Sequence, residues 1–181
     1  MRRSLILALL FLFPAATLTL YAQVAPAAYG NGTSLSVGAV GSMFQPDYAG
    51  RGVAETSPNR LFGVGAYVDY RISRWVQLEG EGRWLRFNEY AGINEDSYMV
   101  GPRVPIHDFH GWTPYGKVLF GLGTGSFLTG TTGTIAFGGG VDYRLTRKLT
   151  VRAIDFEYQY WHVAPTIWPY GGSAGISYTI F

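Results

Sequence analysis

Cysteine is absent from the sequence, and charged residues are few. The 181 residues contain no Cys, and Asp, Glu, Lys and Arg together make up only 14% of them. The lack of thiols excludes disulfide bonds and thiolate metal sites. Because charged residues make up about 25% of an average soluble protein, this chain has unusually little charged surface to present to water.

A net basic charge is also absent once the N-terminal segment is set aside. Residues 1–23 are expected to be a removable secretory signal peptide, because Arg2 and Arg3 precede the apolar stretch Leu5–Leu20. Cleavage after Ala27 is an alternative. Without Arg2 and Arg3, the 14 basic residues become 12 and face 12 acidic ones, which leaves no excess charge for binding nucleic acid.

Long apolar runs are missing from the rest of the chain, since no stretch approaches the roughly 18 consecutive apolar residues of a membrane helix. Instead, apolar and polar residues alternate with period two between clusters of Gly, Asn, Asp, Pro and Ser, which predicts strands joined by turns. Residues 24–181 are expected to form one domain with eight strands. The predicted strands are Ser34–Phe44, Leu61–Ile72, Trp75–Phe87, Tyr98–Ile106, Trp112–Gly123, Thr134–Leu145, Leu149–Trp161 and Gly172–Phe181.

Two near-copies of one heptapeptide, Val68–Arg74 and Val141–Arg147, each end one alternating run and open another. They predict tight hairpins. The predicted connections alternate between long ones at 45–60, 88–97, 124–133 and 162–171 and short ones at 73–74, 107–111 and 146–148. This alternation places all long loops at one end of a barrel, as in outer-membrane proteins, whose short turns face the periplasm.

Alternation gives each strand one apolar and one polar face, but a soluble lipocalin-like barrel would show the same period. Residue choice decides between the two. The chain has twelve arginines and only two lysines, and arginine suits partly buried carboxylates because its planar fork donates two hydrogen bonds. We therefore expect the polar face to line the lumen and the apolar face to contact lipid. The predicted lumen charge network is Asp69, Arg71, Glu79, Glu81, Arg83, Arg103, Lys117, Asp142, Arg144, Arg152, Asp155 and Glu157.

Closure of the sheet follows from energetics, because each unpaired backbone group in hydrocarbon costs several kcal/mol. Eight strands leave an interior just wide enough for side chains to fill. The prediction is an all-β, eight-stranded antiparallel up-and-down transmembrane β-barrel with a filled lumen. The expected ion pairs join Glu79 and Glu81 to Arg71, Arg83 or Arg103, and Arg144 to Asp142 or Glu79.

Two further patterns concern the strands. Strict alternation fails between Val151 and Ile154, and a β-bulge at Arg152–Ile154 would restore it. Aromatic residues gather near the predicted strand ends, where the girdles at the two membrane interfaces lie. These residues are Tyr70, Trp75, Trp84, Phe87, Trp112, Tyr143, Tyr160, Trp161, Trp168 and Tyr178.

Five short segments resemble the OmpA-like outer-membrane β-barrel domain family: Val64–Arg71, Val100–Arg103, Thr113–Tyr115, Phe137–Arg144 and Gly175–Tyr178. The resemblance covers essentially the whole chain after residue 23. It implies an eight-stranded barrel in the cell outer membrane, in a family that includes surface adhesins and structural proteins.

The resemblance also implies a C-terminal signal for barrel insertion, in which apolar residues alternate before a final Phe. Here Ile176, Tyr178 and Ile180 share parity, whereas Phe181 falls one position out. Pro102 also departs from a simple strand, because proline cannot donate a ladder hydrogen bond.

Motifs that could carry chemistry are weak. Gly171–Gly175 matches the Gly-x-Ser-x-Gly nucleophile elbow, but a terminal strand follows it where a helix is required. His107 and His110 could offer two metal ligands, although the segment is first of all a turn. Glu79 and Glu81 are more simply partners of lumen bases than catalytic carboxylates. No cofactor or metal is therefore expected.

The expected function is a non-enzymatic outer-membrane protein with a structural or surface-interaction role. Its expected partners are outer-membrane lipid, the barrel-insertion machinery and an extracellular molecule that binds the long loops. The loop aromatics that could contact such a molecule are Tyr48, Tyr90, Phe127, Trp168 and Tyr170. Three alternatives remain open: a lipid-modifying enzyme using His162 or Ser173, a narrow solute channel, and a secreted lipid-binding barrel.

Overall fold

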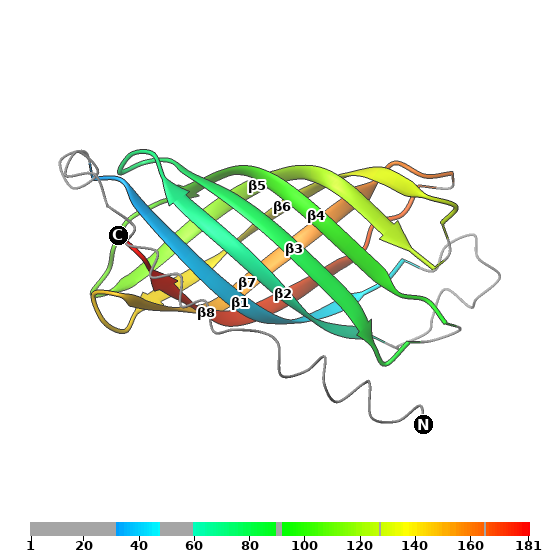
Figure 1. Ribbon diagram of the computed structural model, residues 1–181, viewed down its shortest axis with the longest axis horizontal. Helices are drawn as coiled ribbons and strands as arrows, with labels where there is room; N and C mark the ends of the chain where they lie inside the picture. Colours follow the sequence, from blue (N-terminus) through cyan, green and yellow to red (C-terminus); the bar gives the residue numbers. More distant parts are fainter. Residues whose placement is uncertain (1–31, 48–59, 90–91, 127, 165) are drawn as a thin grey trace, which may run out of the picture.

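The computed structural model describes residues 32–47, 60–89, 92–126, 128–164 and 166–181. In Figure 1 the described chain forms a closed barrel in which each strand pairs with the next and the last pairs with the first, all antiparallel. The predicted eight-stranded up-and-down barrel is confirmed. The strands are β1 (Ser34–Gln45), β2 (Leu61–Arg71), β3 (Gln77–Phe87), β4 (Glu95–Pro105), β5 (Trp112–Gly125), β6 (Thr131–Arg144), β7 (Leu149–Trp161) and β8 (Tyr170–Thr179).

Some predictions lie outside the described residues. They are the signal peptide at residues 1–23 and the loop aromatics Tyr48, Tyr90 and Phe127. Among the described residues, none belongs to a helix with the length and apolar character needed to cross a membrane.

Several strand boundaries differ from those predicted. β4 begins at Glu95, three residues before the predicted Tyr98, and β8 runs from Tyr170 to Thr179, where Gly172–Phe181 was predicted. The polar residues at the start of β4 suggested a loop, but they continue the ladder, with Glu95 opposite Leu85. At the long-loop end, polar residues thus belong to strands when their side chains face inward.

The two copies of the heptapeptide form hairpins with the same turn chemistry. In the β2–β3 turn, the Ser73 hydroxyl oxygen accepts hydrogen bonds from the backbone N–H groups of Trp75 and Val76. In the β6–β7 turn, the Thr146 hydroxyl accepts from Lys148 and Leu149 in the same way. The β2–β3 connection is longer than predicted by three residues, Ile72, Trp75 and Val76, because the Ser73 hydroxyl binds the N–H groups of Trp75 and Val76 within the turn.

The predicted β-bulge in β7 is confirmed. Val141 of β6 lies opposite Ile154, and its neighbour Asp142 lies opposite Arg152, so that Ala153 has no partner on β6. The ladder to β8 breaks at the same place. The extra residue lets Arg152 and Asp155, three positions apart, both face the interior.

Pro102 is part of β4 and lies opposite Leu78 of β3. On the other side, the ladder to β5 is interrupted between Val100 and Arg103, without a change of register. The missing proline N–H falls in this interruption, which explains how a strand in a closed barrel accommodates the residue.

Glycines in the wall make room for large interior side chains. A Cβ atom added to Gly38 of β1 would lie 2.4 Å from the Tyr67 ring, and one added to Gly123 of β5 would lie 2.6 Å from the Trp161 ring. No side chain fits at these two positions. The narrow lumen is therefore filled in part by aromatic side chains that lie against glycines of nearby strands.

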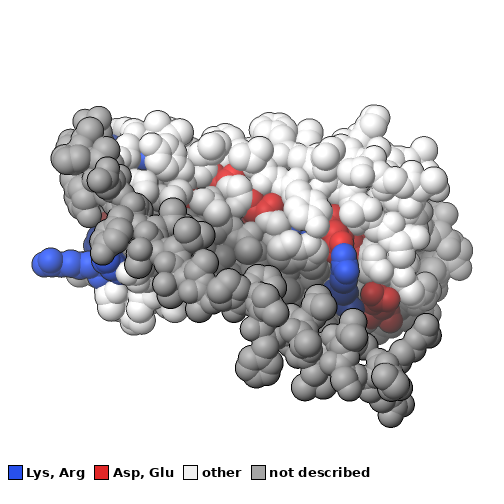
Figure 2. Space-filling model, viewed as in Figure 1, with Lys and Arg blue, Asp and Glu red and all other residues white. Residues whose placement is uncertain are grey.

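The outer surface is apolar. Figure 2 shows that white, uncharged residues cover most of the described part of one face; a few acidic atoms are visible near its middle, and basic atoms appear toward both ends, protruding at the end that carries the C-terminus in Figure 1. Exposed aromatic residues mark both ends of the wall, as predicted for two girdles: Trp75, Trp112 and Tyr178 at the short-turn end, and Phe87, Tyr158, Trp168 and Tyr170 at the long-loop end.

The assignment of Trp161 to a girdle is wrong. Its side chain is only 1% exposed, and its indole N–H donates to Gln159 Oε1 at 2.9 Å. Trp161 shares strand parity with Gln159 and Glu157, which are both buried, so its ring lies inside the barrel.

Candidate functional site

Lys117 lies at the centre of the interior and is surrounded by carboxylates. Its Nζ atom is 2.8 Å from Glu79, 3.1 Å from Glu81, 2.7 Å from Asp155 and 2.7 Å from Glu157. The four acids come from two strands, β3 and β7, and Lys117 comes from β5. An ammonium has three protons to donate, so four carboxylates exceed what Lys117 alone can satisfy.

Arg83 supplies the remaining donors for this cluster. Its guanidinium donates two hydrogen bonds to Glu157, at 2.8 and 2.9 Å, and also contacts Glu81. The guanidinium carbon lies 4.4 Å from the centre of the Phe44 ring. Bidentate pairing holds this arginine in one orientation, while the aromatic face shields it from the apolar side.

Arg152 joins this cluster to the short-turn side of the lumen. Its Nη2 atom is 2.7 Å from Glu79 and 3.2 Å from Asp69, and its guanidinium carbon lies 3.7 Å from the centre of the Tyr67 ring. The bulge at Ala153 makes these contacts possible by turning Arg152 inward.

Arg103 closes the network toward the short-turn end. It donates to Asp142 Oδ2 and to Gln77 Oε1, each at 2.5 Å, and its guanidinium carbon lies 3.6 Å from the Tyr115 ring centre. Its Nε atom is 3.4 Å from Glu79. One continuous set of ion pairs therefore crosses the lumen from β2 to β7.

We refer to these ion-paired interior residues as the charged layer. Nine of its members are buried and Asp142 is half-buried. It consists of Asp69, Glu79, Glu81, Arg83, Arg103, Lys117, Asp142, Arg152, Asp155 and Glu157. The wall formed by β1 and β8 contains no charged residue; it contributes the Phe44 ring and small polar side chains such as Ser42 and Ser173, whose hydroxyls are 2.8 Å apart.

Beyond the charged layer, the interior toward the long loops holds two apolar clusters, and the polar residues Glu95, Ser97 and Thr134 are also buried there. Phe44, Leu61 and Leu85 form one buried cluster, and Met99, Leu119 and Ala136 form another. Trp161 and Ile167 are also buried near this end. A solute moving along the lumen would therefore meet a packed apolar region as well as the charged layer.

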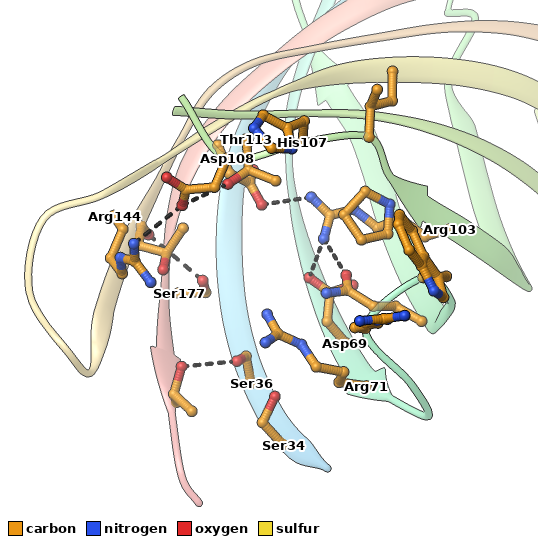
Figure 3. Close-up of a pocket in the computed structure, with 18 of the residues that line it drawn as sticks. Ser34, Ser36, Asp69, Arg71, Arg103, His107, Asp108, Thr113, Arg144 and Ser177 are labelled. Carbon is orange, nitrogen blue, oxygen red and sulfur yellow. Dashed lines mark hydrogen bonds and ion pairs between the residues drawn. The ribbon is translucent and has the colours of Figure 1, made fainter. Parts of the chain in front are cut away.

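A cavity of about 580 Å³ opens at the short-turn end, which we call the mouth cavity (Figure 3). Its floor is formed by the members of the charged layer nearest this end, Asp69, Arg103 and Asp142, together with Gln77, which accepts a hydrogen bond from Arg103. Four arginines lie around its entrance: Arg71, Arg74, Arg144 and Arg147.

Arg71 and Arg144, which the sequence placed in the lumen network, lie in this entrance instead. Both side chains are exposed, because these arginines are the last residues of β2 and β6. Arg144 Nη2 lies 3.0 Å from Asp108, so the expected pairing with Asp142 or Glu79 is wrong. Glu79 pairs with Lys117, Arg152 and Arg103, and among the described residues none makes an ion pair with Arg71.

Sequence reasoning missed the neutral residues that support the charged layer. The buried members of this set are Tyr67, Gln77, Tyr115 and Gln159. Their strand parity, identical to that of the charged residues, was the available signal. Parity does not say which of them contacts a guanidinium, because the two side chains come from strands that face each other only after the barrel closes.

Asp108 organises the β4–β5 turn at the entrance. Its carboxylate accepts a hydrogen bond from the backbone N–H of Gly111 at 3.0 Å and forms an ion pair with Arg144. The Gly111 N–H is the main reason that the pKa of Asp108 lies below its ordinary value, and Arg144 lowers the pKa further. This carboxylate is ionised at neutral pH and holds Arg144 beside the cavity.

The residues considered for chemistry are not arranged for it. Oxygen atoms of Glu79, Glu81 and Asp155 lie within 4.8 Å of one another, as metal ligands could, but the Lys117 ammonium hydrogen-bonds all three. Ser173 lies within β8 and bonds to the Ser42 hydroxyl, with no helix following it. His162 lies beyond β7, 3.4 Å from the Tyr160 hydroxyl.

The C-terminal residues keep the parity expected from the sequence. Ile176, Tyr178 and Ile180 are exposed on the outer surface, with 44–47% of their area accessible. Phe181 lines the mouth cavity, and its carbonyl accepts a hydrogen bond from Leu35 N–H.

Comparison with solved structures gives matches to outer-membrane barrels at low sequence identity. Neisserial surface protein A is 16% identical with a TM-score of 0.60, and the match covers 82% of this chain and 97% of that one. The outer membrane protein AlkL is 12% identical with a TM-score of 0.53, over 83% and 91% of the two chains. OprG from Pseudomonas aeruginosa is 10% identical with a TM-score of 0.51, over 83% and 96%. These likenesses show the fold.

Among curated proteins, none matches this sequence. A family model described as "Outer membrane protein beta-barrel domain" matches residues 5–179. This match covers nearly the whole chain and agrees with the closed barrel, its apolar wall and its alternating loop lengths. The chain therefore belongs to the outer membrane protein β-barrel domain family and is an integral protein of the outer membrane.

Proposed function

We propose that this protein is a sealed, non-enzymatic outer-membrane barrel with a structural or surface-interaction role. The observation that carries the proposal is the Lys117 ammonium held by four carboxylates across the middle of the lumen. Breaking a buried ion pair by removing one partner costs about 3–5 kcal/mol. An ion crossing the barrel would have to separate several such pairs and then cross the apolar interior.

Planar-bilayer recording tests the seal. We expect no stable single-channel conductance from purified protein whose insertion is verified by its heat-dependent shift on a detergent gel. A variant with Lys117, Arg83 and Leu119 all changed to Ala serves as the open control, provided that the same gel shift verifies its folding, and it should conduct. Stable conductance of the unaltered protein would reject the seal and favour the narrow channel.

The surface role is proposed for the long-loop end. Tyr160 and Trp168 have ring centres 4.7 Å apart, and Tyr158 lies 5.6 Å from Trp168 and 6.2 Å from Tyr170. The Trp168 backbone N–H also donates to Asp47, which follows β1. Such a rigid aromatic surface suits a protein contact, and it equally suits anchoring at the membrane interface.

Replacing Trp168 with Ala separates the two roles. If the surface binds a partner, cells carrying the variant should lose adhesion while the barrel keeps its unfolding midpoint and its level in the outer membrane. Trp112→Ala, which alters the opposite girdle, is the control and should leave adhesion unchanged. A fall in barrel stability with unchanged adhesion would assign Trp168 to anchoring.

The absence of enzymatic activity is also a proposal. Ser173 bonds to Ser42 inside the barrel, which leaves it without a base of the kind that nucleophilic catalysis needs. Mass spectrometry of lipid A from cells with and without the protein should give identical acylation. A reproducible difference would favour the lipid-modifying enzyme.

The targeting roles of the two ends are proposed as well. Residues 1–23 would be removed on export, which the mass of the protein purified from membranes would test. Ile176, Tyr178, Ile180 and Phe181 would form the signal read by the insertion machinery. Changing outward-facing Tyr178 to Asp should slow assembly in cells, whereas the same change at Tyr98, outward-facing in β4, should leave the signal intact.

A further inference from the structure

We propose that the mouth cavity binds an oxyanion, a phosphate or carboxylate group, through the arginines at its entrance. The cavity of about 580 Å³ lies in the range of about 300–1,000 Å³ that is typical of small-molecule sites. It is lined by residues from the first and last strands and from all three short turns. Because the turns face the periplasm, the ligand would come from that side.

The direction of the arginine side chains favours a ligand inside the mouth. Arg71 continues the inward-facing series of Tyr67 and Asp69 along β2, and Arg144 continues that of Asp142 along β6. Figure 3 shows Arg71 and Arg144 directed from different strands toward the same space. The β2–β3 and β6–β7 turns stand four strands apart in the eight-stranded ring, so their arginines approach from opposite walls.

The hydrogen-bond donors of these arginines are available. Arg144 pairs with Asp108, and Arg74 stacks on Trp75 at 4.9 Å. Within the described ranges, no ion pair or hydrogen bond from a side chain of Arg71 or Arg147 is formed. Guanidinium groups match phosphate and carboxylate oxygens with paired hydrogen bonds.

The floor of the cavity does not supply those oxygens. The Oδ2 atoms of Asp69 and Asp142 pair with Arg152 and Arg103, and although their Oδ1 atoms accept no hydrogen bond, neither acid forms an ion pair with Arg71 or Arg147 among the described residues. The charged layer has six carboxylates and four cations, so its negative charge offsets part of the positive charge of the entrance arginines. That offset does not satisfy the donors of Arg71 and Arg147, whereas a ligand oxyanion within the cavity would.

Trp75 provides a direct reporter, since it lines the cavity and 58% of its side chain is exposed. The experiment is a titration of the ¹⁵N-labelled protein in phosphatidylcholine nanodiscs, with the indole signals followed by NMR and Trp75→Phe used for assignment. The probes are inorganic phosphate and propane-1,2,3-tricarboxylate, with the neutral triamide of the latter as a control. The Trp75 signal should shift saturably with both anions and stay fixed with the triamide, and the Trp168 signal should not shift.

Matched variants locate the effect. Arg71→Gln and Arg147→Gln should each weaken binding roughly tenfold, the change expected from losing one charge-assisted hydrogen bond. Arg60→Gln removes the same charge at the opposite end of the barrel and should leave the affinity unchanged. A heat-dependent gel shift verifies that each variant is folded.

A second arm identifies the source of the oxyanion. In nanodiscs containing phosphatidylglycerol, a lipid headgroup bound in the cavity should shift the Trp75 signal before any anion is added, by an amount that Arg71→Gln reduces and Arg60→Gln does not, and should weaken the apparent affinity for soluble anions. A soluble ligand should give the same titration in both membranes. The proposal is overturned if neither arm moves the Trp75 signal saturably, or if Arg60→Gln weakens binding as much as Arg71→Gln. The readout lies at the mouth, so the result does not depend on whether the barrel conducts.

Discussion

The charged layer and the entrance of the mouth cavity use the same side chains in opposite surroundings. Lys117 and its carboxylates have side chains that are at most 1% exposed, whereas those of Arg144 and Asp108 are 60% and 44% exposed. Attraction between charges is strong where water is excluded, but so is the cost of leaving one unpaired. In the lumen, ion pairs stabilise the barrel. At the entrance, arginines that form no ion pair keep their hydrogen-bond donors available for a ligand.

The largest effect is expected from removing the central cation. Lys117→Met keeps most of the side-chain volume but leaves four buried carboxylates without their shared ammonium. The free energy of unfolding should fall by about 3–5 kcal/mol. Urea unfolding in lipid vesicles, followed by the gel shift, would measure the change.

A second substitution sharpens that result. Adding Glu81→Gln to Lys117→Met removes one of the uncompensated acids, so the double variant should be more stable than Lys117→Met alone. If Lys117→Met costs less than about 1 kcal/mol, the charged layer is solvated and does not resemble a buried network.

The outer wall should respond next most strongly. Val100 is 51% exposed on the outer surface near the middle of β4, so Val100→Arg should cost about 2–4 kcal/mol near the bilayer midplane. Val141 lies three residues from the end of β6, and the same substitution there should cost less. Equal costs at the two positions would contradict the placement of the membrane along the strands.

At the entrance, the expected stability effect is small. Arg144→Ala removes an exposed pair with Asp108, which should leave the free energy of unfolding nearly unchanged because water screens both charges. The change should shrink further as salt is added, because exposed charges are screened. A cost close to that of Lys117→Met would mean that Arg144 belongs to the charged layer after all.

The smallest effect concerns pH. Because the folded-state pKa of Asp108 is lowered, its contribution to stability is complete above its unfolded value of about 3.9 and is lost as the pH falls through the folded value. Carboxyl NMR should give a pKa for Asp108 below that unfolded value. Arg144→Gln should raise it only slightly, since the Gly111 N–H is the main cause. A large rise would make Arg144 the dominant partner.

Much of the fold could be predicted from local patterns, and the exceptions have physical causes. The bulge at Ala153 was predictable because a parity break involves only neighbouring residues. The start of β4 at Glu95 was not, since polar residues facing inward resemble a loop. Trp161 was misplaced because an aromatic residue at a strand end suits both the membrane interface and a lumen, although its parity with Glu157 and Gln159 indicates the lumen.

The candidate site was less predictable than the fold. The sequence grouped twelve charged residues by parity, and parity alone cannot tell how deep each lies along its strand. Depth separates Arg71 and Arg144 from the charged layer, because both lie at strand ends beside the entrance.

By itself, the sequence determined an eight-stranded membrane barrel and the two faces of each strand, because side-chain alternation and the need to pair every backbone group depend on local order. Only the tertiary structure decided that Lys117 meets four acids and that an arginine-lined cavity opens at the mouth. Those contacts join strands that do not pair, and only closure with a particular stagger sets them opposite one another.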